Sequence, residues 1–141
     1  VAAGTPGGVR GRAAAFCLAA SAEQVGSVFL MCKESVSVPV HRCALRDARN
    51  DNTAVANVLA GRRARGVINR IMREVGPLSA DALPFPLAGG PLTPLRAATE
   101  PKGKGDFQPL WSGQAGRYAR EESATLTAQR MLQQASERLR L

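Results

Sequence analysis

The sequence predicts an α/β fold, because two short apolar strands flank a glycine-rich loop and a helix in its first 30 residues. Residues 1–3 are the end of the first strand, which breaks at the glycine-rich loop of residues 4–8. Residues 12–20 are strong helix formers with small side chains, and residues 23–30 are predicted as a second strand interrupted by a glycine. Strand, loop, helix and strand in about 30 residues is the pattern of a βαβ unit with parallel strands.

The rest of the chain is predicted to contain several helices and irregular connections. Residues 76–109 are rich in proline and are expected to be irregular, with one short helix. A stripe of apolar residues predicts an amphipathic terminal helix, for which Ser123 is a suitable N-cap. The expected elements are a helix at 40–49, a strand or extended segment at 53–59, a helix at 65–75, the short helix at 92–99 and the terminal helix from 123.

Charge permits a polyanionic partner, since the 141 residues carry a net charge of +8 and have an isoelectric point near 10.7. The arginines are scattered, however, and the one dense run, at 61–65, has no aromatic residue interleaved with it. A surface that stacks single-stranded nucleic acid needs such aromatic residues. We therefore expect solvated arginine side chains and no nucleic-acid partner.

The three cysteines, Cys17, Cys32 and Cys43, are odd in number and lack the spacing of a zinc site. Neither a disulfide framework nor a metal site is expected from them, and reduced thiols favour a cytoplasmic location. The sequence shows no signal-peptide pattern and no apolar run of membrane-spanning length, so we expect no membrane association.

Two glycine turns on either side of the first helix are the feature most relevant to function. Gly4 ends the first strand and Gly26 follows the second, 22 residues later. Adjacent parallel strands would bring both turns to one edge of the sheet, where backbone N–H groups and the hydroxyls of Thr5 and Ser27 could converge on one phosphate. Glycine allows the backbone to approach the anion closely. The same spacing also fits two turns that only end strands.

A family resemblance rests first on residues 1–30, VAAGTPGGVRGRAAAFCLAASAEQVGSVFL. Without a gap they resemble a nitronate monooxygenase segment of the form IAAGGI–x–DGRG–xAAAL–xLGA–x–x–VQMGT–xF. Further matches follow in the same order. MCKES at 31–35 is similar to ATEES, residues 51–70 resemble a DT–…–GRPAR–…–N segment, and LWSGQAG at 110–116 resembles LWAGQ. An amphipathic helix follows, as it does in the family.

The resemblance implies the C-terminal part of a (β/α)8 TIM barrel, comprising its last two βα units and a C-terminal helical extension. Residues 1–50 would be the phosphate-binding βα units and residues 51–141 the extension, all within one partial FMN-binding barrel domain. Thr5 stands where the family has glycine, and Pro6 removes an N–H group, so both departures should weaken FMN binding. By resemblance, the residues that hold the FMN phosphate are Gly4, Thr5, Gln24, Val25, Gly26 and Ser27.

The implied activity of the intact protein is oxidation of alkyl nitronates with O2 through reduced flavin. A flavin-dependent enoyl reductase of the same superfamily is an alternative, and a non-catalytic basic RNA-binding module is an alternative of another class. The family's catalytic base is a histidine on an earlier barrel strand, whereas His41 follows the second turn and is expected at a helix start. We assign no catalytic residue, and we expect the chain alone to be inactive because a partial barrel leaves sheet edges uncovered.

Overall fold

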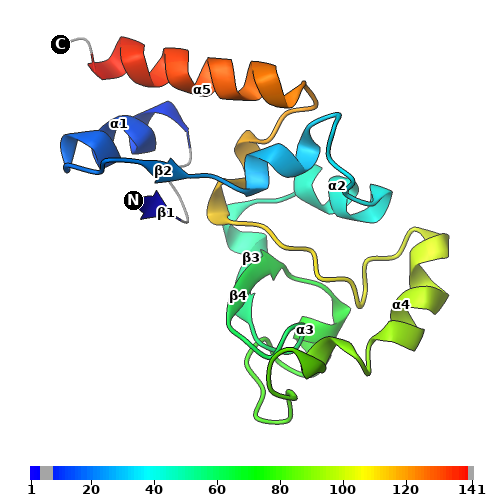
Figure 1. Cartoon of the computed structure of the whole chain (residues 1–141). Coiled ribbons are helices and arrows are strands. Elements are labelled where there is room, and N and C mark those ends of the chain that lie inside the picture. The colour runs from blue at the N-terminus through cyan, green and yellow to red at the C-terminus, as the bar shows by residue number, and fades with distance from the viewer. Residues whose placement is uncertain (4–7, 140–141) are drawn as a thin grey trace. The chain divides into compact units, whose positions relative to one another are not determined.

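The computed structural model describes residues 1–3 and 8–139. The chain divides into two compact units, one formed by Val1–Ser37 with Gly113–Leu141 and the other by Val38–Ser112. We refer to the first as the discontinuous unit and to the second as the inserted unit. Figure 1 labels the helices and strands of both.

The discontinuous unit is built on two short parallel strands. β1 (Ala2–Ala3) pairs with β2 (Glu23–Gln24), and Ala3 lies opposite Gln24. The connecting helix α1 (Val9–Cys17) begins and ends three residues earlier than the sequence predicts. Ala19 adopts a left-handed conformation with φ 63°, which helps to end the helix. The predicted strand–helix–strand unit with parallel strands is therefore confirmed.

The second strand is shorter than predicted. Only Glu23–Gln24 of residues 23–30 form a strand, and the chain continues through Gly26 into the 3-10 helix η1 (Ser27–Met31). Val28 and Met31 are the buried residues of η1, and side chains three apart lie on one face of such a helix. A short apolar run fits a strand and a helical turn equally well, so its pattern alone did not distinguish them.

Helix α5 (Ala124–Leu139) packs against α1 within the discontinuous unit (Figure 1). Ser123 is its N-cap as predicted, because the Ser123 Oγ accepts a hydrogen bond of 3.2 Å from the Leu126 N–H. The Glu34 carboxylate also accepts the Ala124 N–H, with distances of 3.0 and 3.1 Å to its two oxygens. The start of α5 is therefore fixed to the segment that follows η1.

The inserted unit contains an antiparallel hairpin that the sequence did not predict. β3 (Thr53–Ala56) pairs with β4 (Ala64–Val67), where a helix was expected over residues 65–75. The helix α3 (Arg70–Glu74) begins only after Asn69, whose side chain caps it. The helical spacing of the apolar residues was misleading because Val67 belongs to the buried part of the strand.

The other elements of the inserted unit surround this hairpin. One cluster of its buried apolar residues comes from β3, the following turn, α3 and the residue before the helix α4 (Thr93–Thr99): Ala56, Val58, Leu59, Met72 and Leu92. The predicted helices near 40–49 and 92–99 are confirmed. The remaining elements are α2 (Pro39–Arg46), α4 (Thr93–Thr99) and the 3-10 helices η2 (Asn50–Asn52), η3 (Leu87–Gly89) and η4 (Glu100–Lys102).

Candidate functional site

The C-terminal ends of β1 and β2 lie at the same edge of the strand pair. β1 ends at Ala3, which lies opposite Gln24, the last residue of β2, and the two strands run parallel. The chain therefore continues in the same direction from both strands. Gly4 and Thr5, two of the predicted site residues, lie outside the described residues. On the far side of that gap, Gly8 has φ 91° and is the N-cap of α1, a conformation that favours glycine.

Gly26, in the second turn, is exposed and borders open space. Its φ of −114° is one that other residues adopt without strain. A Cβ added at Gly26 would meet no heavy atom within 4 Å. Packing within the described part of the chain therefore gives no reason for a glycine here. Close approach of a ligand to the backbone would give one.

Ser27 follows at the start of η1 and is half-buried. Its Oγ accepts a hydrogen bond from the Gly113 N–H at 2.7 Å. A hydroxyl group carries one proton in addition to its lone pairs, and the Gly113 N–H occupies a lone pair. Among residues 1–3 and 8–139, the structure shows no acceptor for the hydroxyl proton of Ser27. The hydroxyl proton of Ser27 is therefore not used in a contact within the described residues.

Gln24 and Val25 contribute to a different space. They line an open cavity of about 500 Å³ within the discontinuous unit, bounded by α1, β2, η1 and α5. Gly26 and Ser27 are not among its lining residues. The predicted site is thus split between the turn at Gly26–Ser27 and this cavity. The described residues that line it are Arg12, Phe16, Glu23, Gln24, Val25, Phe29, Ala128, Met131, Leu132 and Ala135.

The cavity wall holds a buried pair of opposite charges that the sequence did not reveal. The side chains of Arg12 and Glu23 are only 6% and 9% exposed, and Arg12 Nε lies 4.0 Å from Glu23 Oε2. Among the described residues, Arg12 Nε and Glu23 Oε1 have no hydrogen-bond partner. Burial raises the pKa of Glu23 and lowers the pKa of Arg12, and in both cases it outweighs the opposing effect of the partner's charge. The attraction between the two charges therefore offsets only part of the free energy lost when both side chains leave water.

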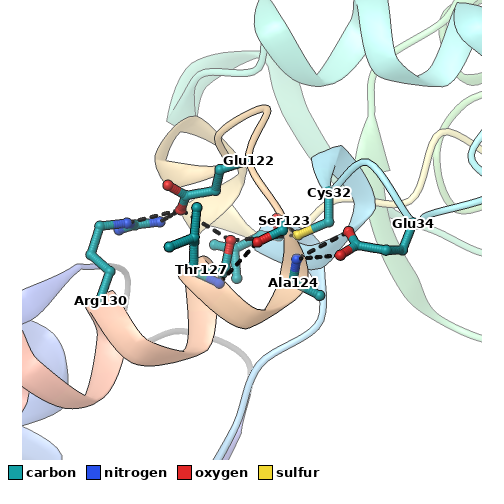
Figure 2. Close-up of polar contacts among 9 residues, drawn as sticks. Cys32, Glu34, Glu122, Ser123, Ala124, Thr127 and Arg130 are labelled. Carbon is teal, nitrogen blue, oxygen red and sulfur yellow. Dashed lines mark hydrogen bonds and ion pairs between the residues drawn. The ribbon is translucent and has the colours of Figure 1, made fainter.

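A polar network connects η1 to α5 (Figure 2). The buried Cys32 follows η1, and its Sγ lies 3.5 Å from the Thr127 Oγ1. The Thr127 hydroxyl donates to Glu122 Oε1 at 3.0 Å, and Arg130 Nε donates to the same oxygen at 2.9 Å. The hydrogen bond from Arg130 lowers the pKa of Glu122. These contacts fix the far end of η1, while Gly113 holds Ser27 at its near end.

The 3-10 helix η5 (Gln114–Tyr118), which follows Gly113, reaches the start of α1. A Cβ added at Gly8 would lie 3.3 Å from the Tyr118 ring, so this ring packs directly on the backbone of Gly8. The Arg117 guanidinium donates to the Tyr118 hydroxyl at 2.8 Å. Residues 113–118 therefore contact Ser27 in the second turn and Gly8 at the start of α1. The sequence identified this segment only by its resemblance to LWAGQ.

His41 occupies the predicted position near the start of a helix. It is the third residue of α2, and its Nε2 lies 2.9 Å from the Trp111 carbonyl oxygen. A carbonyl can only accept, so Nε2 carries the proton and donates. Within the described ranges no cluster of three or more His, Cys, Asp or Glu side chains could hold a metal ion. None of the helices in the same ranges is long and apolar enough to span a bilayer.

Comparison with known proteins identifies the family. The sequence profile of the nitronate monooxygenases matches residues 1–133. The chain is 34% identical over 113 residues to a probable nitronate monooxygenase of Bacillus subtilis, covering 80% of this chain and 33% of that protein. It is 36% identical over 113 residues to the nitronate monooxygenase of Pseudomonas aeruginosa, covering 79% of this chain and 32% of that protein. It spans about a third of the length of these curated relatives.

Solved structures agree with the sequence comparison. A nitroalkane oxidase from Streptomyces ansochromogenes superimposes with a TM-score of 0.83 and 31% identity, covering 96% of this chain and 39% of that one. A variant of FabK from Thermotoga maritima superimposes with a TM-score of 0.68 and 26% identity, covering 96% and 40%. The mixture of helix and strand agrees with a portion of an α/β barrel. This chain belongs to the nitronate monooxygenase family.

Proposed function

We propose that the chain supplies the FMN-phosphate site of a nitronate monooxygenase that oxidises alkyl nitronates with O2. In this proposal it forms the last two βα units and the C-terminal helical extension of a (β/α)8 barrel. The observation that carries the proposal is the parallel pairing of Ala3 with Gln24, because the C-terminal ends of both strands then lie at one edge of the sheet. Phosphate sites in such barrels are often built from two neighbouring loops of this kind.

The residues of the second turn suit a phosphate group. The Ser27 hydroxyl has a proton to donate, and Gly26 leaves space beside it. The first N–H groups of η1 have no partner within that helix, as at any helix start. The first turn leads into α1, whose N-terminus carries a partial positive charge that favours an anion. By family resemblance, Gly4 and Thr5 would bind from that side.

Bound FMN would supply the redox chemistry, taking electrons from the nitronate and passing them to O2. The residues of this chain would bind the phosphate and orient the cofactor. We place no proton-transfer step on a described residue, because His41 is engaged with the Trp111 carbonyl in the inserted unit. The substrate contacts and the catalytic base would come from other parts of the family's barrel.

A flavin-dependent enoyl reductase is the second candidate, and the similarity to FabK supports it less well than the nitronate monooxygenase relatives support the first. Both candidates need the same phosphate site, so flavin binding does not separate them. A full-length protein that contains this chain should consume O2 with an alkyl nitronate if the first proposal holds. Reduction of an enoyl thioester by a nicotinamide cofactor, without nitronate oxidation, would favour the second. The 141-residue chain alone should show neither reaction.

The RNA-binding alternative gains no support from the basic run at 61–65. Arg62 lies over the Phe85 ring, 4.3 Å from its centre, while Arg65 donates to the Thr53 carbonyl oxygen and hydroxyl at 3.2 Å each. The side chains of this run are therefore used in part for internal contacts. RNA binding that is tight and salt-sensitive, in the absence of flavin binding, would reverse this choice.

Titration of the chain with FMN tests the proposed site. Flavin fluorescence should be quenched on binding, and Gly26→Asp should abolish the quenching by placing a negative charge beside the phosphate. Gly26→Asn, a neutral side chain of similar size, is the matched control and should weaken binding less. Urea unfolding should give similar stability for both variants, since a Cβ at Gly26 meets no atom. Absence of binding at millimolar FMN would contradict the proposal.

A further inference from the structure

We propose that Gly113 is a positioning residue whose backbone N–H orients the Ser27 hydroxyl so that its proton points to the FMN phosphate. The inference rests on the proposed function and adds a component from a distant part of the chain. The Gly113 N–H lies 2.7 Å from the Ser27 Oγ, although 86 positions separate the two residues. Nothing in the pattern of the two glycine turns points to this contact.

The chemistry of the hydroxyl group makes the contact directional. A serine hydroxyl rotates freely about its Cβ–Oγ bond, and in water it samples several hydrogen-bond geometries. The Gly113 N–H can only donate, so it occupies a lone pair of the Ser27 Oγ. The proton of the Ser27 hydroxyl therefore cannot point towards Gly113. The proton must then point elsewhere, and no residue in the described part of the chain accepts it. An anion next to Gly26 would be that acceptor.

The surrounding structure keeps Ser27 from turning away. η1 begins at Ser27, and its other end is fixed through Cys32 and Thr127 to the start of α5. Donation from Gly113 therefore acts on a residue whose backbone is already held. Preorganisation of this kind lowers the cost of binding because less freedom is lost when the ligand arrives. Gly113 would thus contribute to affinity without touching the phosphate.

Proline at position 113 is a suitable probe because it removes the N–H donor and can keep the φ angle of Gly113. Gly113 has φ −69° and ψ 168°, and proline holds φ near −65°. Gly113→Ala keeps the N–H and is the matched control. We expect Gly113→Pro to weaken FMN binding by about tenfold, the scale of one hydrogen bond to a charged group. Riboflavin, which lacks the phosphate, should bind both variants and the unaltered chain equally.

A double-mutant cycle separates positioning from general damage. Ser27→Ala should weaken FMN binding by about tenfold or more and leave riboflavin binding unchanged. In the Ser27→Ala background, Gly113→Pro should have no further effect, because no hydroxyl remains to be oriented. Ser27→Thr should restore the sensitivity to Gly113→Pro.

The possible outcomes distinguish the inference from the function it rests on. If Ser27→Ala weakens FMN binding but Gly113→Pro does not, the positioning role is wrong and the phosphate site stands. If Gly113→Pro weakens FMN binding equally in the unaltered chain and in the Ser27→Ala background, its effect is structural. That result would also overturn the inference. If the unaltered chain binds FMN no better than riboflavin, the proposed phosphate site fails, and the inference fails with it.

Discussion

The buried pair of Arg12 and Glu23 gives the sharpest prediction for stability. At 4.0 Å their attraction is about 4 kcal/mol with an effective dielectric constant of about 20. Loss of water costs several kcal/mol for each buried ion, and Arg12 Nε and Glu23 Oε1 lack hydrogen-bond partners within residues 1–3 and 8–139. The pair should therefore add little net stability. Removing one member alone should be costly, since the other charge stays buried.

We expect Arg12→Met to destabilise the chain by about 3 kcal/mol and the double variant Arg12→Met/Glu23→Leu to recover all of that loss or more. Chemical unfolding in urea, followed by circular dichroism, measures both free energies. The matched control is Glu23→Leu alone, which leaves the Arg12 charge buried and should also be destabilising. A double variant no more stable than Arg12→Met, or a loss below about 1 kcal/mol in Arg12→Met, would refute this account of the pair.

The pH dependence of Arg12→Met provides a second check. Burial raises the pKa of Glu23 above its usual value of 4.5, so the folded chain holds this proton more tightly than the unfolded chain does. That contribution to stability is fully present below pH 4.5 and is lost as the pH rises through the folded pKa. Without Arg12 the pKa of Glu23 should rise further. The destabilisation by Arg12→Met should therefore shrink as the pH is lowered towards 4.5.

Three further predictions concern single residues, each read out by urea unfolding. Asn69→Leu should cost about 2–4 kcal/mol, because the buried Asn69 amide donates to two backbone carbonyls at 2.9 and 3.0 Å and its oxygen caps α3; a cost below about 1 kcal/mol would contradict this. Gly61→Ala should cost well over 2 kcal/mol, since φ is 81° and a Cβ would collide with backbone of residues 83–85, whereas Gly103→Ala, with φ 68° and open space, should cost about 1 kcal/mol. Equal losses at the two glycines would be inconsistent with the steric argument. The hydrogen bond from Arg130 lowers the pKa of Glu122, so its stabilising effect should be present above pH 4.5 and lost on acidification through the folded pKa. Glu122→Gln should remove that part of the acid dependence, and an unchanged pH profile would argue against it.

Local patterns predicted the elements that depend on nearby residues. The strand–helix–strand order of residues 1–24, the cap at Ser123 and the short helix at Thr93–Thr99 all follow from turn and cap chemistry. Prediction failed at residues 65–67, where apolar spacing suggested a helix but the chain forms β4. There β4 is specified by its pairing with β3, which lies several residues away and which periodicity does not report. Asn69, a good N-cap, was the available signal that the helix begins later.

At the candidate site, too, sequence patterns did not predict contacts between residues that are far apart in the chain. Gly26 and Ser27 could be named from turn chemistry and from family resemblance, because their residue types are suited to an anion. The hydrogen-bond partner of Ser27 could not be predicted, because it is a backbone N–H and the residue type does not indicate which backbone N–H will be used. Arg12 and Glu23 were also missed as a pair: 11 positions apart, they meet only because β2 returns beside α1. Contacts of this kind depend on topology and require coordinates.

The contact between Ser27 and Gly113 has a consequence for protein synthesis. At about 5–20 residues per second, a ribosome makes Gly113 roughly 4–17 s after Ser27, because 86 positions separate them. During that interval the inserted unit, Val38–Ser112, is translated as one continuous stretch. Throughout this interval the Ser27 hydroxyl lacks its hydrogen bond from the Gly113 N–H. Under the proposed function, flavin binding should therefore come late, and a pause before codon 113 should delay it without delaying the pairing of β3 with β4.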